Sequence, residues 1–283
     1  MPFKDLLVHL DGGAATARRL DFALSLAQRM GAQLTALYTL DLVPSIETLA
    51  RSSAGQMQYL ERYDELLEAA QDEARRIESR FRDGLRREGI TGEWRFLESL
   101  PAETAALHAR YADLAIVGQI DPENSPPGSA ARVPEEVLLS SGRPALVVPY
   151  AGTFKTAGEN VLVAWKATRE SARALNDALP LLERAKKVTV LTVNPERGDD
   201  QETGIPAADI AHHLAHHGVV AEAATTIAED ISAGDALLNY AADSGADLMV
   251  MGGYGHSRAR EFLLGGVTRQ ILQQMTLPVL MAH

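Results

Sequence analysis

A glycine-rich segment near the end of the chain combines residue types that suit a negatively charged ligand. It runs from Met251 to Thr268 and contains Gly252, Gly255 and the pair Gly265-Gly266. Glycines have no Cβ atom, so their backbone can approach phosphate oxygens closely and adopt positive φ angles. A helix predicted over 267–274 follows, and the unpaired amides of its first turn, together with its dipole, favour an anion. The segment therefore predicts a phosphate-binding loop.

The position of this segment in the chain fits the same chemistry. A predicted strand, Leu248–Met251, precedes the glycines, and in open α/β sheets ligands bind beyond the carboxyl ends of the strands. Thr268 adds a hydroxyl donor, and Arg258 and Arg260 add positive charge. Close packing of a strand against a helix is the alternative explanation for the glycines. The segment is neither a Walker A loop, because no Lys-Ser/Thr follows the glycines, nor the dinucleotide-binding fingerprint, because its spacing differs.

Two side chains within the segment are candidates for proton transfer. His256 and Glu261 could act as general acid and base beside a terminal phosphate, or they could be exposed loop residues. They keep a slow nucleotide hydrolase open as an alternative function. No Ser-His-Asp arrangement with interpretable spacing is found. We therefore assign no catalytic residue and expect weak ATP hydrolysis at most.

Four histidines cluster on another predicted helix. His212 and His216 form one i,i+4 pair and His213 and His217 form a second, so each pair shares a helix face and could chelate zinc or nickel. Asp209 lies one turn earlier without completing a clear ligand set. A solvated helix end, with histidines near its negative terminus, is the alternative reading. No metal site is assigned from the sequence.

The strands and helices that must position these candidates occur twice along the chain, in the same order. Each half opens with an apolar strand, continues through a turn into an amphipathic helix and a second strand, and closes with an Ala-Asp-Leu segment and a Pro-containing strand. The matching pairs are 3–11 with 160–166, 15–30 with 169–185, 33–40 with 187–193, 112–118 with 246–252, and 143–149 with 277–283. The repeat predicts domains at residues 1–150 and 158–283, with a linker between them.

Short apolar strands that alternate with helices are typical of βαβ units and a parallel sheet. The strands are continuous apolar runs, as expected where helices cover both faces of the sheet. We therefore predict an α/β protein with two tandem, open, five-stranded parallel sheets of the Rossmann-like type. The more polar strands, 91–98 and 221–227, are expected at edges. A long solvent-facing helix is predicted over 59–88, after a mobile loop at 52–55.

Composition narrows the classes of partner. The formal net charge is −11 and the chain has no cysteine, so disulfides and thiolate sites are excluded. An acidic chain repels phosphate backbones and anionic lipids at long range. No apolar run approaches the length that spans a bilayer, and the N-terminus lacks a signal-peptide pattern. The sequence therefore predicts a cytoplasmic protein that binds neither nucleic acid nor membrane.

The glycine spacing resembles the ATP-binding signature of the universal stress protein family, Gly-x2-Gly-x9-Gly-Ser/Thr. Gly252, Gly255 and Gly265 match it, whereas Gly266 stands at the Ser/Thr position. The strand openings, the Ala-Asp-Leu segments and the closing strands extend the resemblance over nearly the whole chain, in two copies. It implies a five-stranded parallel sheet of the adenine nucleotide alpha hydrolase-like type. It also implies pairing through the last strand, between the two halves of the chain or in a homodimer.

The resemblance further implies ATP, or another adenine nucleotide, as the ligand, with Mg²⁺ as an optional companion. In ATP-binding members an Asp lies near the adenine and ribose, but Lys166 follows the first strand of the second half here. Lysine cannot accept a hydrogen bond, so adenine specificity is in doubt while phosphate binding is kept. The binding residues implied are Ala164, Val193, Met251, Gly252, Gly255, Gly265, Gly266, Val267 and Thr268.

The first half keeps the acidic residue and lacks the glycine signature. Asp11 matches the acidic position, but the later segment, 118–127, contains two acids and three prolines in place of the glycines. His9 is read as a packed histidine of the first strand. We interpret this half as a degenerate binding domain, retained for pairing or regulation.

The leading hypothesis is a cytoplasmic stress-response protein that holds ATP or a related nucleotide in its second half. The nucleotide would then shift domain pairing or partner binding. Two alternatives stay open: a nucleotide-free scaffold or interaction protein, which the residues at 166 and 266 favour, and the slow hydrolase.

Overall fold

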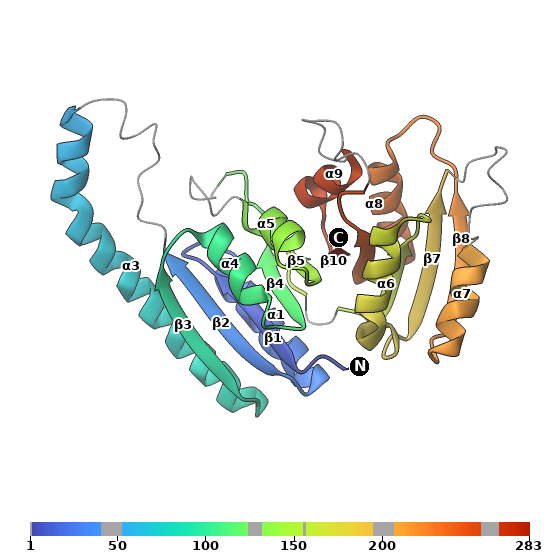
Figure 1. The fold of residues 1–283 in the computed structure, drawn as a ribbon, viewed down its shortest axis with the longest axis horizontal. Coiled ribbons are helices and arrows are strands. Elements are labelled where there is room, and N and C mark those ends of the chain that lie inside the picture. Colours follow the sequence, from blue (N-terminus) through green and yellow to red (C-terminus); the bar gives the residue numbers. More distant parts are fainter. Residues whose placement is uncertain (1, 41–52, 124–131, 155–156, 195–206, 256–265) are drawn as a thin grey trace. The chain divides into compact units, whose positions relative to one another are not determined.

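The computed structural model describes residues 2–40, 53–123, 132–154, 157–194, 207–255 and 266–283, with side chains left out for 53–64 and 66. The chain divides into two compact units. One, called the N-terminal unit below, is Lys4–Ser141. The other, called the C-terminal unit, is Gly142–His283 together with the first three residues. Each unit is an α/β sandwich in which helices alternate with strands (Figure 1).

The N-terminal unit holds four parallel strands in the order β3-β2-β1-β4. Helix α1 packs against α3, and α4 packs against α5. The strands are β1 Asp5–Leu10, β2 Gln33–Leu40, β3 Gly92–Glu98 and β4 Leu114–Gly118, and the helices are α1 Thr16–Met30, α3 Ser53–Glu88, α4 Pro101–Ala109 and α5 Val133–Ser140.

The C-terminal unit repeats this plan with five parallel strands in the order β10-β9-β6-β7-β8. A sixth strand, β5 (Ala145–Val148), runs antiparallel beside β10. The parallel strands are β6 Asn160–Ala164, β7 Lys187–Val193, β8 Ala221–Thr226, β9 Leu248–Gly252 and β10 Val279–Ala282; the helices are α6 Arg169–Leu182, α7 Ala207–His216, α8 Ala233–Ser244 and α9 Gly266–Gln274.

The predicted α/β class, with tandem parallel sheets, is confirmed. The central strands of each unit bury most of their side chains, for example Leu6–Leu10 in β1 and Leu248–Met251 in β9. Such runs need helices on both faces to stay out of water. The polar strands β3 and β8 lie at the ends of the strand orders, as predicted. Within the described residues, none of the helices is long and apolar enough to cross a membrane.

The boundary between the two compact units lies nearer to the N-terminus than the linker that the repeat predicts. The repeat predicts domains at residues 1–150 and 158–283, whereas the compact units meet between Ser141 and Gly142. Strand β5 accounts for the difference, because Ala145, Leu146 and Val147 pair with residues of β10. The last strand of the first repeat therefore extends the sheet of the second.

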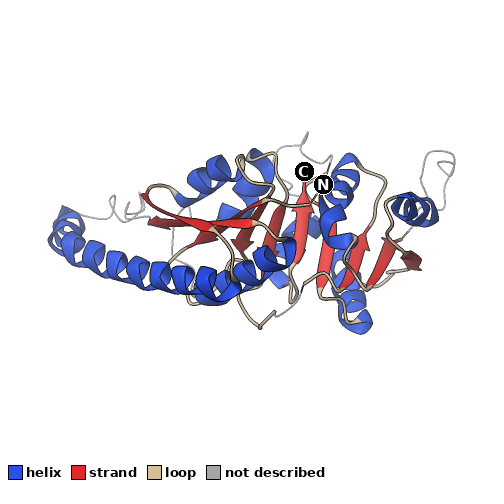
Figure 2. Cartoon of the chain, turned by 90° about the horizontal axis from the view of Figure 1, so that it is seen from below, coloured by secondary structure: helices blue, strands red, loops and turns tan. Residues whose placement is uncertain are grey.

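The long helix α3 is a prominent feature of the N-terminal unit (Figure 2). It begins at Ser53, ahead of the predicted start at 59, so the expectation of a loop at 52–55 is wrong for residues 53–55; residue 52 lies outside the described residues. Its buried stripe is Ala74, Ile77 and Phe81, spaced as one helix face requires. Phe81 contacts the Trp94 ring, with ring centroids 6.0 Å apart. The stripe holds the second half of α3 on the sheet.

Both units share a point at which the strand order reverses. In the C-terminal unit the chain moves from β6 outward to β7 and β8, then returns to the other side of β6 with β9. In the N-terminal unit the same reversal lies between β1 and β4. Ligands of open α/β sheets bind at the carboxyl ends of the strands beside such a reversal. These two positions, β6/β9 and β1/β4, are called the C-terminal and N-terminal switch points below.

Candidate functional site

The C-terminal switch point brings together predicted binding residues from the ends of three strands, β6, β7 and β9. Ala164 ends β6 and pairs with Met251 of β9, and Gly252 ends β9. Met251 is buried, so its side chain packs in the core, and only its backbone reaches the end of the strand. Val193 ends β7, the strand on the other side of β6. All four residues therefore lie at the carboxyl ends of neighbouring parallel strands.

Gly252 is required by packing. A Cβ atom at this position would lie 2.6 Å from the Ser171 backbone nitrogen and 2.7 Å from the Glu170 carbonyl carbon, at the first turn of α6. Real Cβ atoms do not approach backbone so closely. Packing of a strand against a helix, the alternative raised from the sequence, therefore explains this glycine.

Gly252 and Gly255 do not use the positive φ angles that glycine permits. The left-handed residue of this turn is Tyr254, with φ of 50°. A Cβ atom on Gly255 would lie 3.6 Å from Glu170 Oε2, an ordinary contact. Gly255 therefore leaves space beside the first turn of α6 without being demanded by it.

The turn after β9 is tied to both neighbouring elements. The Gly253 amide donates to the Ala282 carbonyl at 2.9 Å, next to β10. The Tyr254 amide donates to Thr268 Oγ1 at 3.2 Å, and Thr268 is 5% exposed. The hydroxyl that the sequence suggested as a phosphate donor therefore accepts a hydrogen bond within the protein.

Glu170 is the buried acidic group of this site. Its side chain is 2% exposed, Oε1 forms an ion pair with Arg169, and Oε2 has no hydrogen-bond partner among the described residues. Burial raises the pKa of Glu170, but the hydrogen bond from Arg169 and those of the first helical turn outweigh it and hold the pKa below its usual range. The site therefore carries a carboxylate beside Gly255.

Some of the remaining predicted residues lie on the surface of the described structure, and the others lie outside it. Gly266 begins α9 and is exposed, and within the part of the chain that the structure describes a Cβ atom there would meet no non-neighbouring residue within 4 Å, so the Ser or Thr of the family signature would fit. Val267 follows it, half-buried, and Lys166 is exposed. Outside the described residues lie Gly265, His256, Arg258, Arg260 and Glu261.

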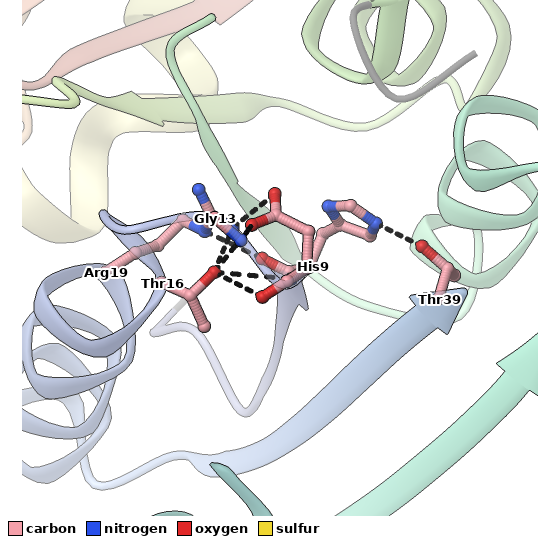
Figure 3. Close-up of polar contacts among 6 residues, drawn as sticks. His9, Gly13, Thr16, Arg19 and Thr39 are labelled. Atoms are coloured by element: carbon pink, nitrogen blue, oxygen red, sulfur yellow. Dashed lines mark hydrogen bonds and ion pairs between the residues drawn. The ribbon is translucent and has the colours of Figure 1, made fainter. Parts of the chain in front are cut away.

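The N-terminal switch point is filled by the protein's own side chains (Figure 3). Arg19, 4% exposed, lies on the apolar face of α1. Its Nη2 contacts Asp11 Oδ2 at 2.8 Å and its Nε donates to the His9 carbonyl at 2.8 Å. Asp11 also accepts from the Gly13 amide at 2.8 Å and from the Thr16 hydroxyl at 2.6 Å. The acidic residue expected near a ligand is thus paired internally.

Gly118 shows how completely Arg19 fills this position. Gly118 ends β4, as Gly252 ends β9. A Cβ atom on Gly118 would lie only 1.8 Å from Nη1 of Arg19. The guanidinium therefore occupies the space next to the strand end. Its charge is offset by Asp11, and this arrangement provides the physical basis for the prediction of a degenerate first half.

His9, read from the sequence as a packed histidine, is 2% exposed, and its Nε2 lies 2.7 Å from Thr39 Oγ1 (Figure 3). Burial lowers its pKa from 6.5 to about 4, against the effect of Asp11, which raises it. The folded state therefore keeps His9 neutral where the unfolded chain would protonate it. Stability is full above pH 6.5 and falls as the pH drops from 6.5 toward 4.

We predict that this change amounts to about 3 kcal/mol of unfolding free energy, since each pKa unit is worth about 1.4 kcal/mol. Urea denaturation of the wild type and of His9→Gln, between pH 7 and pH 4.5, measures it. The pH slope of the variant should be clearly smaller. Equal slopes would show that His9 does not carry the effect. The pKa of Asp11 is also lowered, but the stability that its carboxylate contributes is lost only below this pH window.

Sequence reasoning missed Arg19 and Glu170. Arg19 shares its helix face with Thr16, Leu20 and Ala23, and a cation on such a face signals a buried partner. Glu170 lies in the first turn of α6, where acids are common because they favour the helix dipole. Its burial depends on Gly252 and could not be foreseen locally.

Comparison with known proteins gives a family match for the second half of the chain and a fold match for the whole of it. Residues 158–283 match the sequence model of the Universal stress protein family. Universal stress protein Slr1230 of Synechocystis sp. is 41% identical over 46 residues, which are 16% of this chain and 16% of that protein. The match to that relative thus spans under a fifth of its length.

Solved structures extend the likeness to the whole chain. A universal stress protein from Archaeoglobus fulgidus has a TM-score of 0.65 and 16% identity, covering 98% of this chain and 97% of that one. PA1789 of Pseudomonas aeruginosa, described as functionally unknown, has a TM-score of 0.57 and 15% identity, covering 99% and 92%. Residues 158–283 therefore match the universal stress protein family, and the whole chain shares the fold of these solved structures.

Proposed function

We propose that the C-terminal unit binds ATP, or a related adenine nucleotide, through its phosphates at the C-terminal switch point. The observation that carries the proposal is the contrast between the two switch points. Arg19 fills the space beside Gly118 and neutralises Asp11. At the C-terminal switch point a Cβ atom on Gly255 would meet Glu170 Oε2 at 3.6 Å, an ordinary contact, and α9 begins at Gly266, so the amides of its first turn can face a ligand. Unhindered amides at a helix start suit phosphate oxygens.

Glu170 shapes the kind of nucleotide that fits. A buried carboxylate repels a bare phosphate, whereas Mg²⁺ is commonly held by one or two carboxylates together with substrate phosphates. Oε2 of Glu170 lacks a hydrogen-bond partner among the described residues, so it fits a bound cation. Glu170 would hold the Mg²⁺, which would screen the phosphate charge. A Mg²⁺-nucleotide therefore suits this site better than a free nucleotide.

The ligand should be detectable in two ways. Nucleotide should be released when freshly purified protein is denatured and the supernatant is separated by chromatography. At about 100 times its dissociation constant, the nucleotide should add about 2.7 kcal/mol to the unfolding free energy. Thermal shifts with ATP, ADP and AMP, each with and without Mg²⁺, measure this. An unchanged melting temperature with every nucleotide would reject the proposal.

A nucleotide-free interaction protein is the second candidate function. Two observations favour it: Gly252 is explained by packing alone, and Thr268 is already engaged with the Tyr254 amide. The homodimer, the cytoplasmic location and the role in stress response belong to both proposals, as expectations from the family. The thermal shifts described above separate the two candidates.

A further inference from the structure

Four histidines at the end of α7 lie outside the nucleotide site: His212, His213 and His216 belong to the helix, and His217 follows it directly. All four are exposed, while Ile210 and Leu214 anchor the opposite side of the helix in the core. The rings of His212 and His216 have centroids 4.6 Å apart, and those of His213 and His217 are 4.9 Å apart. The two i,i+4 pairs are thus already brought together.

These separations match what a shared metal ion requires. A metal–nitrogen bond is about 2.0–2.1 Å long, so two imidazole rings on one ion at an angle of about 90–110° have centres about 4.5–5.2 Å apart. Both observed distances fall in that interval. The rings meet edge to face, with interplanar angles of 66° and 62°. Only side-chain rotation is then needed to turn a nitrogen of each ring toward one ion.

The backbone that carries these rings is fixed by the end of the helix. The His217 amide donates to the Leu214 carbonyl at 2.9 Å, and Gly218, with φ of 75°, turns the chain so that the Val219 amide reaches the same carbonyl. The backbone therefore needs no ordering when an ion binds, and the entropy lost is that of the side chains.

We propose that each pair, His212/His216 and His213/His217, is a two-nitrogen chelating site for borderline transition-metal dications such as Cu²⁺, Ni²⁺ and Zn²⁺. The pairs are about 100° apart around the helix, because successive residues turn by that angle, so they form two sites. No group of three or more histidines and acids in the described part of the chain is arranged to hold a metal. Water therefore completes the coordination, and Asp209 is not a ligand. The net charge of −11 favours cations at long range.

Two matched variants test the pairing itself, using the full chain without a histidine tag. His212→Gln/His216→Gln keeps the second pair intact. His213→Gln/His216→Gln keeps His212 and His217, which are five residues apart and therefore about 140° apart around the helix. Each variant retains six of the eight histidines of the chain, so background binding is the same. Glutamine is a good helix former, and circular dichroism confirms that the helix is kept.

Titration with Ni²⁺ by calorimetry gives the decisive comparison. The first variant should bind one ion with nearly the wild-type affinity, and the second should bind about 100-fold more weakly, since two linked ligands act as an intramolecular pair. Cu²⁺ should bind more tightly than Ni²⁺, and Mg²⁺, which prefers oxygen ligands, should not bind. Equal Ni²⁺ affinity of the two variants, or no binding by the wild type, would overturn the proposal.

Discussion

Replacing Arg19 with methionine should lower the unfolding free energy by about 3 kcal/mol, because it breaks an ion pair of a buried arginine with a 26% exposed aspartate and leaves the carboxylate without its cation. Arg19 is 4% exposed and joins Asp11, Thr16 and the His9 carbonyl. Without it, the Asp11 carboxylate keeps only the Gly13 amide and the Thr16 hydroxyl. The loss should appear in urea denaturation as a lower midpoint with little change in slope.

Two controls separate this effect from the loss of a long side chain. Arg80→Met removes an exposed ion pair, in which the side chains of Arg80 and Asp21 are 50% and 43% exposed. It should lower the unfolding free energy by at most about 1 kcal/mol. The double variant Arg19→Met/Asp11→Asn should recover much of the loss, because it leaves no unpaired charge. An Arg19→Met protein as stable as Arg80→Met would mean that the N-terminal switch point is not closed by this pair.

Replacing Gly252 with alanine should also destabilise the fold, by about 1–3 kcal/mol, as expected for overpacking. The added methyl group would meet the Ser171 nitrogen at 2.6 Å and the Glu170 backbone at 2.7 Å. Backbone at a helix start moves less readily than the end of a side chain, so the first turn of α6 must shift. Chemical denaturation gives the value.

Gly266→Ala is the matched control. Among the described residues, apart from its chain neighbours and its own helix backbone, a Cβ atom at Gly266 would meet nothing within 4 Å, and its φ lies outside the left-handed range. Alanine at this helical position should be neutral or stabilising by up to about 1 kcal/mol. If the two alanine variants had the same stability, the close contact between β9 and α6 would be refuted.

Periodicity and repetition were sufficient to predict much of the fold. Strands 33–40 and 187–193 lie where they were expected, because continuous apolar runs bounded by turns report local structure directly. Helix α3 begins earlier than the sequence predicts, because Ser53 and Gly55 have low helix propensity and yet lie within it.

The contents of the two switch points were harder to predict. The glycine spacing led to the correct strand end, yet it does not distinguish Gly252, which packing requires, from Gly255 and Gly266, which leave space. The charge that fills the N-terminal site comes from Arg19, one helical turn inside α1. Such occupancy depends on side chains that meet only after the sheet has formed, so local patterns do not encode it.

The central claim is that the two repeats have diverged into one closed and one open nucleotide site. Equilibrium dialysis with Mg²⁺-ATP, on protein freed of any bound nucleotide, tests it through the number of ATP molecules bound per chain. The account predicts one. It also predicts none for Gly255→Val, which should keep its stability because a Cβ atom there has room, while its methyl groups enter the proposed site. Two ATP molecules per chain, or undiminished binding by the valine variant, would contradict the account.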